Sequence, residues 1–234
     1  MMRFFAGMAV CLLAGCTPAP DERVDPARYD AFFLWAGVRA PEVLESAKTI
    51  YLLDGEVQVA DATRLVPLRP HTPQVRHADV WLTVRLERLD WHEGVYRQIM
   101  ADLERWERAG NRVVGLQLDF DAKTRGLNGY AAFLRDMRTR LPARYKLSIT
   151  GLMDWSAGGD SAALASLADV VDEVIVQTYQ GRDTIPGYQR YLATLQRLPM
   201  NYRIGLVERG QWQAPPTLAR DPQFKGYVVF LLPR

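Results

Sequence analysis

The chain has 234 residues, of which 48% are hydrophobic and 24% are charged, and its formal net charge is +2. These proportions are those of an ordinary globular protein, and the length fits a single domain with a substantial core. The small net charge, with lysine and arginine scattered along the chain, excludes a strongly basic nucleic-acid-binding surface.

The first residues have the pattern of a secretory signal that ends in a lipidation site. Arg3 precedes an apolar run, residues 4–15, that is too short to span a bilayer. The run ends in Leu13-Ala14-Gly15-Cys16, which resembles a bacterial lipobox and implies cleavage before Cys16 and lipidation of that cysteine. Thr17 follows in place of an aspartate retention signal, so by resemblance to Gram-negative lipoproteins we expect the outer membrane, facing the periplasm. The alternative is a plain secretory signal with a chance cysteine.

The lipobox divides the chain into three predicted parts. They are a signal peptide at residues 1–15, a lipidated tether at residues 16–28 and one domain at residues 29–234. Of the two cysteines, Cys11 leaves with the signal and Cys16 carries the lipid, so we expect no disulfide, no thiol nucleophile and no thiolate metal site in the mature chain. We also expect no cofactor, no metal and a monomeric protein.

Beyond the tether, strand and helix patterns alternate along the chain. In chain order the predicted strands are residues 31–38, 49–53, 56–59, 80–87, 115–121, 145–152, 173–179, 202–207 and 226–232, and the predicted helices are residues 94–108, 129–141, 161–167 and 188–198. Asp54-Gly55 is predicted as a hairpin turn, and residues 61–77, with three prolines and no helical period, as loop.

With residues 49–53 and 56–59 counted together as one hairpin, this order of about eight strands predicts an α/β fold, a small (β/α)₈ barrel of the TIM type with an irregular segment between strands 2 and 3. The alternative is an open, doubly wound sheet. No glycine-rich turn follows the first predicted strand, which argues against that alternative.

The most informative strand is Gly-Leu-Gln-Leu-Asp-Phe-Asp at residues 115–121. Successive strand side chains alternate between faces, so Gln117, Asp119 and Asp121 share one face. Helical patterns precede and follow this segment in the sequence. They indicate a parallel strand that is covered on both faces. Carboxylates on a covered face point into a cavity, because an unpaired buried carboxylate is very costly. Asp119 and Asp121 are therefore candidate site residues.

Neighbouring strands place more polar residues on the same inward face. The predicted inward set is Trp81, Thr83, Arg85 and Glu87, then Lys146, Ser148 and Thr150, then Ile175, Gln177 and Tyr179. Barrels of this type carry their active sites at the C-terminal strand ends, where this set is richest in polar groups. The alternative interpretation is a self-satisfied network, in which Arg85 and Lys146 neutralise Asp119.

Two segments resemble motifs of chitinase-type glycoside hydrolases. Residues 115–121 resemble the fourth-strand signature Asp-Gly-x-Asp-x-Asp-Trp-Glu, with Gln117 at the second aspartate, Asp119 at the third and Asp121 at the catalytic glutamate. Residues 176–180 resemble the sixth-strand motif Met-x-Tyr-Asp, which implies that Tyr179 holds the substrate amide.

The mature chain resembles still more closely an uncharacterised family of bacterial lipoproteins, a domain of unknown function with a glycosidase-like barrel. The shared runs are Leu-Gln-x-Asp-Phe-Asp, Leu-Ser-x-Thr, Val-Asp-Glu-x-x-x-Gln-x-Tyr and Ile-Gly-Leu, at residues 116–121, 147–150, 171–179 and 204–206. This resemblance covers most of the chain and implies an anchored envelope protein, and the chitinase-type resemblance implies that it acts on a polysaccharide.

The implied catalytic residues are Asp121, Asp119 and Tyr179. The candidate substrate-binding residues are Gln117, Gln177, Arg85, Glu87, Trp155 and Glu208. A two-carboxylate mechanism with Glu87, Asp154 or Glu208 as the partner of Asp121 is also open.

Departures from the chitinase pattern favour a second hypothesis. Asp121 is one methylene shorter than glutamate, and Gln117 replaces an aspartate, so an inactive barrel that binds a glycan or a protein partner is the alternative. Other chemistries have less support, because the three histidines lack paired zinc spacing and no Gly-x-Ser-x-Gly motif is present.

Overall fold

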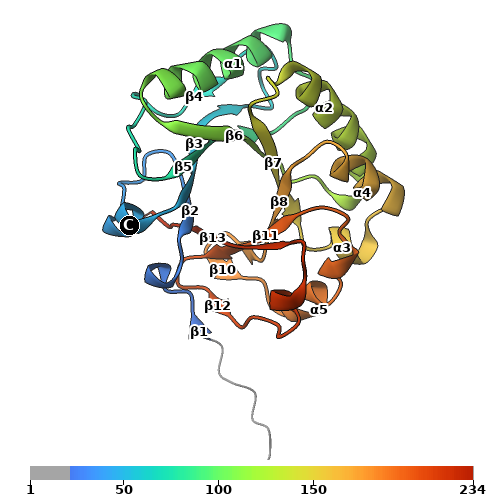
Figure 1. The fold of residues 1–234 in the computed structure, drawn as a ribbon. Coiled ribbons are helices and arrows are strands. Elements are labelled where there is room, and N and C mark those ends of the chain that lie inside the picture. Colours follow the sequence, from blue (N-terminus) through green and yellow to red (C-terminus); the bar gives the residue numbers. More distant parts are fainter. Residues whose placement is uncertain (1–21, 234) are drawn as a thin grey trace, which may run out of the picture.

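The computed structural model describes residues 22–233, and in this part of the chain eight parallel strands close into a barrel (Figure 1). In order around the barrel they are β2 (Ala31–Leu34), β3 (Thr49–Val57), β5 (Asp79–Leu86), β6 (Arg112–Asp119), β7 (Lys146–Leu152), β8 (Glu173–Gln177), β11 (Tyr202–Val207) and β13 (Phe224–Phe230). Strand β2 pairs with both β13 and β3, which closes the sheet. The predicted (β/α)₈ barrel is thereby confirmed. The signal peptide and Cys16 lie outside the described residues, so the predicted division of the chain stays a prediction.

Helices cover the barrel on one side more fully than on the other (Figure 1). The α-helices are α1 (Glu93–Arg108), α2 (Leu127–Arg140), α3 (Trp155–Gly158), α4 (Ser161–Ala168) and α5 (Tyr188–Leu192). Short 3₁₀ helices are η1 (Pro26–Arg28), η2 (Glu42–Ser46), η3 (Thr124–Gly126), η4 (Leu195–Arg197) and η5 (Leu218–Arg220). None of the helices within residues 22–233 is long and apolar enough to cross a membrane.

The segment between the second and third barrel strands is irregular, as predicted. Residues 58–78 contain only the short strand β4 (Val66–Pro67), which pairs antiparallel with β3. Arg69 of this segment donates hydrogen bonds to the carbonyl oxygens of Leu53 (2.7 Å), Leu34 (3.1 Å) and Trp35 (3.2 Å). The segment thus ties together the C-terminal end of β2 and its neighbour β3.

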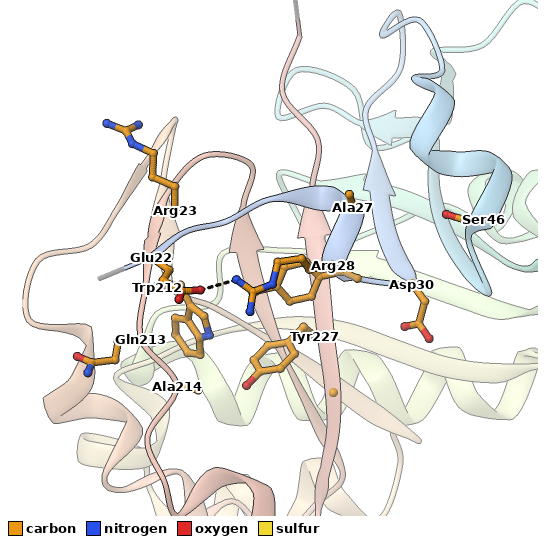
Figure 2. A pocket seen from close by; sticks show the side chains of 12 residues that line it. Glu22, Arg23, Ala27, Arg28, Asp30, Ser46, Trp212, Gln213, Ala214 and Tyr227 are labelled. Atoms are coloured by element: carbon orange, nitrogen blue, oxygen red, sulfur yellow. Dashed lines mark hydrogen bonds and ion pairs between the residues drawn. The ribbon is translucent and has the colours of Figure 1, made fainter. Parts of the chain in front are cut away.

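The N-terminal segment packs against the outside of the barrel near β13. Strand β1 (Glu22–Arg23) pairs with β12 (Gln211–Trp212). Figure 2 shows the result, with the Trp212 and Tyr227 rings close together and Arg28 paired with Glu22 above them. These groups line a cavity of about 800 Å³. Two further short strands, β9 (Tyr179–Gln180) and β10 (Asp183–Thr184), form a hairpin after β8.

The barrel interior has an apolar half and a polar half. Phe33 stacks on Phe230 with ring centroids 4.4 Å apart, and Tyr51 stacks on Trp81 at 5.7 Å. Buried Thr83, Gln117, Ser148 and Thr150 supply the polar half from β5, β6 and β7. The inward orientation predicted for Trp81, Ile175 and Tyr179 is confirmed, since all three belong to this inner cluster.

The predicted Asp54-Gly55 turn is wrong, because β3 runs straight through it to Val57. The strand shifts register between Leu53 and Gly55, and a Cβ at Gly55 would lie 2.9 Å from the Val66 carbonyl oxygen. Gly55 therefore allows β4 to approach β3 closely and does not form a hairpin turn.

Other boundaries differ as well: β2 ends at Leu34 and not at residue 38, and β8 ends at Gln177 and not at Tyr179. Two further differences have a visible cause. Strand β6 ends at Asp119 and not at Asp121, since the backbone N–H of Phe120 donates to the Thr150 hydroxyl oxygen (3.1 Å) and leaves the ladder. The predicted helix at residues 188–198 divides into α5 and η4, and the Thr194 hydroxyl between them donates to the Tyr191 carbonyl (2.8 Å).

Candidate functional site

A cavity of about 880 Å³ lies over the C-terminal ends of five barrel strands. Its lining comes from the segments that end or follow β2, β5, β6, β7 and β8. Parallel strands bring their C-terminal ends to one face of a barrel, and this is where barrels of this type place their sites. The cavity therefore lies where the sequence predicted a site.

Asp119, the last residue of β6, lies at the cavity wall and is only 7% exposed. Its Oδ1 accepts a hydrogen bond from the Thr150 hydroxyl at 2.9 Å. Burial raises the pKa of the Asp119 carboxyl to about 6, and the nearby charge of Asp121 acts in the same direction, whereas the Thr150 hydrogen bond and Arg85 oppose it. Asp119 is thus a carboxyl group able to hold or release a proton near neutral pH.

The alternative of a self-satisfied network, in which Arg85 and Lys146 neutralise Asp119, does not match the described residues. Arg85 is the register partner of Asp119 in the β5–β6 ladder, yet its side chain is exposed and it forms no ion pair within residues 22–233. Lys146 begins β7 and lines a separate cavity with Glu173 and Arg203, near the N-terminal strand ends. There Glu173 accepts hydrogen bonds from Tyr51 and from Arg203, which closes the opposite end of the barrel with a paired polar cluster.

Tyr179 contributes an unsatisfied hydroxyl to the cavity. It is 9% exposed and lines the cavity, and its hydroxyl has no hydrogen-bond partner among the described residues. Burial raises the pKa of this hydroxyl well above its usual range, and the charge of Asp119 raises it further. The Gln177 side chain lies near enough to lower that pKa, but not in hydrogen-bonding geometry. Buried polar groups almost always have partners, so an orphaned one beside a cavity points to a ligand or solvent partner.

Gln117 lies deeper in the barrel and does not line the cavity. It is fully buried, and its Oε1 accepts a hydrogen bond from the Thr83 hydroxyl at 3.1 Å. Its Nε2 has no partner within residues 22–233. Gln117 therefore belongs to the polar half of the barrel interior, beneath the cavity, and is not placed to touch a ligand in the cavity.

The remaining predicted residues divide into two groups. Asp121, Glu87 and Gln177 line the cavity, the first two of them exposed to solvent. Trp155 and Glu208 do not line it.

The predicted sugar-stacking role of Trp155 is wrong. The ring is 1% exposed, and its N–H donates to the Ala122 carbonyl at 2.9 Å, so it is a core residue. The predicted substrate-binding role of Glu208 does not fit its position either. Its carboxylate is 7% exposed and accepts the Leu232 N–H at 3.0 Å, which fixes the chain after β13.

Sequence reasoning missed two aromatic residues of the lining. Trp35 and Tyr191 are partly exposed in the cavity wall. Trp35 packs on Phe33 with ring centroids 4.7 Å apart, which holds its ring at the C-terminal end of β2. The predicted strand at residues 31–38 hid this signal, because β2 ends at Leu34 and Trp35 directly follows it, where barrel sites lie. Lys123 and Asp154 also line the cavity, and Asp154 accepts a hydrogen bond from the Thr124 hydroxyl at 2.7 Å.

Within residues 22–233, no three histidine, cysteine, aspartate or glutamate side chains are grouped so as to hold a metal ion. Carboxyl, hydroxyl, amide and cationic side chains line the cavity beside aromatic rings. A buried carboxyl near a solvent-exposed one is an arrangement suited to acid–base chemistry.

Solved structures with a similar fold are chitinase-like barrels. The chitinase domain of spore coat protein CotE from Clostridium difficile aligns with 11% identity and a TM-score of 0.53, over 85% of this chain and 68% of that one. The tamarind chitinase-like lectin aligns with 11% identity and a TM-score of 0.52, over 86% of this chain and 94% of that one. The spore cortex-lytic enzyme SleL from Bacillus megaterium aligns with 12% identity and a TM-score of 0.51, over 82% of this chain.

These identities establish the fold alone. The chain spans 52% of the length of the Bacillus megaterium SleL and 50% of the Bacillus cereus enzyme of the same name. No curated protein matches the sequence. A family model described as "Domain of unknown function (DUF3142)" matches residues 72–190, half of the chain, and includes β5 to β8 with most of the cavity lining. The protein is therefore a member of the DUF3142 family with a chitinase-like (β/α)₈ barrel.

Proposed function

We propose that this protein binds a polysaccharide in the cavity over the C-terminal strand ends and hydrolyses it with Asp119 and Asp121. The observation that carries the proposal is the position of Asp119. Its carboxyl is buried at the wall of an open cavity, without an ion-pair partner in the described chain, and burial raises its pKa to about 6.

Glycoside hydrolysis commonly uses two carboxyl groups in different environments, one of which holds a proton for the leaving oxygen. Asp119 has the environment of the proton donor. Asp121 is exposed in the same cavity and is free to act on water or on the sugar as the second carboxylate. This assignment exchanges the roles implied by the chitinase signature, in which Asp121 takes the position of the acid.

The rest of the lining suits a sugar chain. The partly exposed rings of Trp35 and Tyr191 offer apolar faces on which sugar rings stack. The unpartnered Tyr179 hydroxyl is a donor for a carbonyl or hydroxyl oxygen of the ligand, which agrees with the role that the sixth-strand resemblance implies.

The test is cleavage of envelope and amino-sugar polysaccharides by the purified protein, measured as new reducing ends. We expect activity that declines as the pH rises above about 6, because the donor must be protonated. Asp119→Asn and Asp121→Asn should each abolish it. Asp169→Asn, at the exposed C-cap residue of α4 outside the cavity, is the matched control and should retain full activity. Cleavage that persists in both site variants would refute the proposed chemistry.

A binding module without turnover is the second candidate. Two features of Asp121 favour it. The residue lies two positions beyond the end of β6, and its side chain is shorter than that of the glutamate in the signature. Glycan binding by wild type and by both site variants, with no cleavage by any of them, would establish this candidate.

We propose further that the protein is anchored in the bacterial cell envelope by a lipid on Cys16. The support is the Leu-Ala-Gly-Cys run at residues 13–16, after a short apolar segment. An anchored barrel would meet its polysaccharide at the outer membrane, on the periplasmic side.

A further inference from the structure

The cavity carries more negative than positive groups, although the whole chain has a net charge of +2. Three carboxylates line it, those of Glu87, Asp121 and Asp154, beside the Asp119 carboxyl, which holds a proton in the proposed chemistry. Two cations, Arg85 and Lys123, line it as well. None of these six groups takes part in an ion pair within residues 22–233, whereas ion pairs are common elsewhere in that part of the chain. The carboxyl groups of the cavity are therefore not ion-paired, either with its two cations or with any other part of the described chain.

The hydrogen bonds around these carboxyl groups orient them without occupying all of their acceptor oxygens. Glu87 accepts the Val59 N–H at 2.7 Å, Asp119 accepts the Thr150 hydroxyl and Asp154 accepts the Thr124 hydroxyl. Each of these three bonds engages a single oxygen of its carboxylate. Each group therefore retains acceptor sites for donors of a ligand.

A second and independent observation marks this space as a ligand site. The Tyr179 side chain is more than nine-tenths buried, its hydroxyl is unpartnered, and it lines the same cavity. A ligand that carries both hydroxyl oxygens and positively charged donors would satisfy the tyrosine and the carboxylates together.

We propose that the saccharide bound here is cationic, an amino sugar polymer in which at least some amines are free and protonated. This inference rests on the proposed function and adds the substrate class. A free ammonium group finds charge-assisted acceptors in the cavity, whereas an N-acetylated sugar offers only a neutral amide. Sugar rings would lie against Trp35 and Tyr191, with ammonium groups directed at the exposed carboxylates of Asp121 and Asp154.

The experiment compares glucosamine and N-acetylglucosamine oligomers of equal length, with a uronate oligomer as the anionic probe. Affinity for the purified full chain is measured by calorimetry at pH 6 and at two salt concentrations. We expect the glucosamine oligomer to bind at least 10-fold more tightly at low salt than the N-acetylated one. The advantage should shrink at high salt, because the salt screens the attraction between exposed charges.

Variants then locate the effect. Asp121→Asn and Asp154→Asn should each weaken binding of the glucosamine oligomer by about 3- to 5-fold, as for partly exposed ion pairs. Each should weaken binding of the N-acetylated oligomer by a smaller factor than binding of the glucosamine oligomer. Asp169→Asn is again the control and should leave both affinities unchanged. Melting temperatures of the variants show that they are folded.

The outcomes separate this inference from the proposed function. Equal or tighter binding of the N-acetylated oligomer would overturn the inference and leave polysaccharide binding intact. Tightest binding of the uronate oligomer, lost in Arg85→Gln, would show that the two cations dominate, and would also overturn it. Binding of none of the three oligomers would contradict the proposed function itself.

Discussion

Replacing Asp119 by asparagine should stabilise the protein at neutral pH. The carboxyl group is buried, accepts one hydroxyl and has no ion-pair partner in the described chain. Asparagine has nearly the same shape and can still accept the Thr150 hydroxyl through its amide oxygen. The substitution therefore removes a buried charge without opening a cavity or breaking the hydrogen bond.

The magnitude follows from the pKa of Asp119 in the two states. The folded chain raises it from an ordinary value of 3.8 to about 6. Between these two pH values the folded state binds more protons than the unfolded state, so the free energy of unfolding falls as the pH rises. This rise in the pKa of Asp119 corresponds to about 3 kcal/mol in the free energy of unfolding. That contribution is fully lost above the pKa of the folded state. The asparagine variant should avoid that loss.

Urea unfolding at two pH values is the assay. At pH 7.5 we expect Asp119→Asn to exceed wild type by about 3 kcal/mol, and at pH 4 by less than about 1 kcal/mol. Burial also raises the pKa of Asp54 to about 6. Asp54 contributes equally to the stability of both proteins, so its contribution cancels in the difference. Asp121→Asn, at an exposed position, is the control and should change stability by no more than about 1 kcal/mol. A loss of several kcal/mol for Asp119→Asn at pH 7.5 would refute this reasoning, since it would mean that a buried ion pair had been broken.

Three further predictions concern the anchor, the tyrosine and the acidic strand. Cys16→Ser should release the protein into the soluble periplasmic fraction and end labelling by radioactive fatty acid; membrane labelling that continues would exclude the lipid anchor. Tyr179→Phe should raise the free energy of unfolding by about 1 kcal/mol, because an unpartnered buried hydroxyl is removed, and should weaken glycan binding in calorimetry; lower stability would instead show that the hydroxyl is hydrogen-bonded. Gly115→Ala should cost about 3 kcal/mol or more in urea unfolding, because its Cβ would lie 2.1 Å from the Lys146 carbonyl oxygen, and near-wild-type stability would contradict that close approach.

Much of the barrel could be predicted because its signals are local. Alternation in β5 and β6 and the helical spacing of α1 all depend on which face of one element is buried. The Asp54-Gly55 error shows the limit. That dipeptide favours a hairpin turn in isolation, but here Gly55 pairs both with β4, in the segment that directly follows, and with β5, and the chain stays extended.

The candidate site was predictable where strand register decides it. Asp119, Arg85 and Tyr179 lie at the C-terminal ends of strands or just beyond them, and the cavity brings them together. Trp155 and Glu208 also follow strand ends, but packing turns them into the core and toward the chain after β13. No sequence pattern distinguishes a residue that lines the cavity from one that is buried elsewhere, because the outcome depends on the path of the loop after the strand.

The partner of Asp119 was likewise beyond sequence reasoning. Lys146 shares the predicted inward face, yet it starts its strand while Thr150, four residues later, reaches the carboxyl. Whether a neighbouring cation pairs with a carboxylate also depends on how far the side chain extends into solvent. Arg85 extends outward, and the burial of Asp119 therefore dominates its titration.

The pairing of β2 with β13 has a consequence for how the barrel forms. Phe32 and Phe33 meet Val229 and Phe230, so the first and last barrel strands are neighbours although almost the whole described chain separates them. Such a contact is among the most distant in sequence that a chain of this length can make, and closing long loops slows folding. Until it forms, β2 and β13 each expose an unpaired edge, and exposed edges pair readily with other chains. During folding, the barrel therefore depends on its last strand for protection from aggregation, and a chaperone that shields the edge of β2 would act at its most vulnerable step.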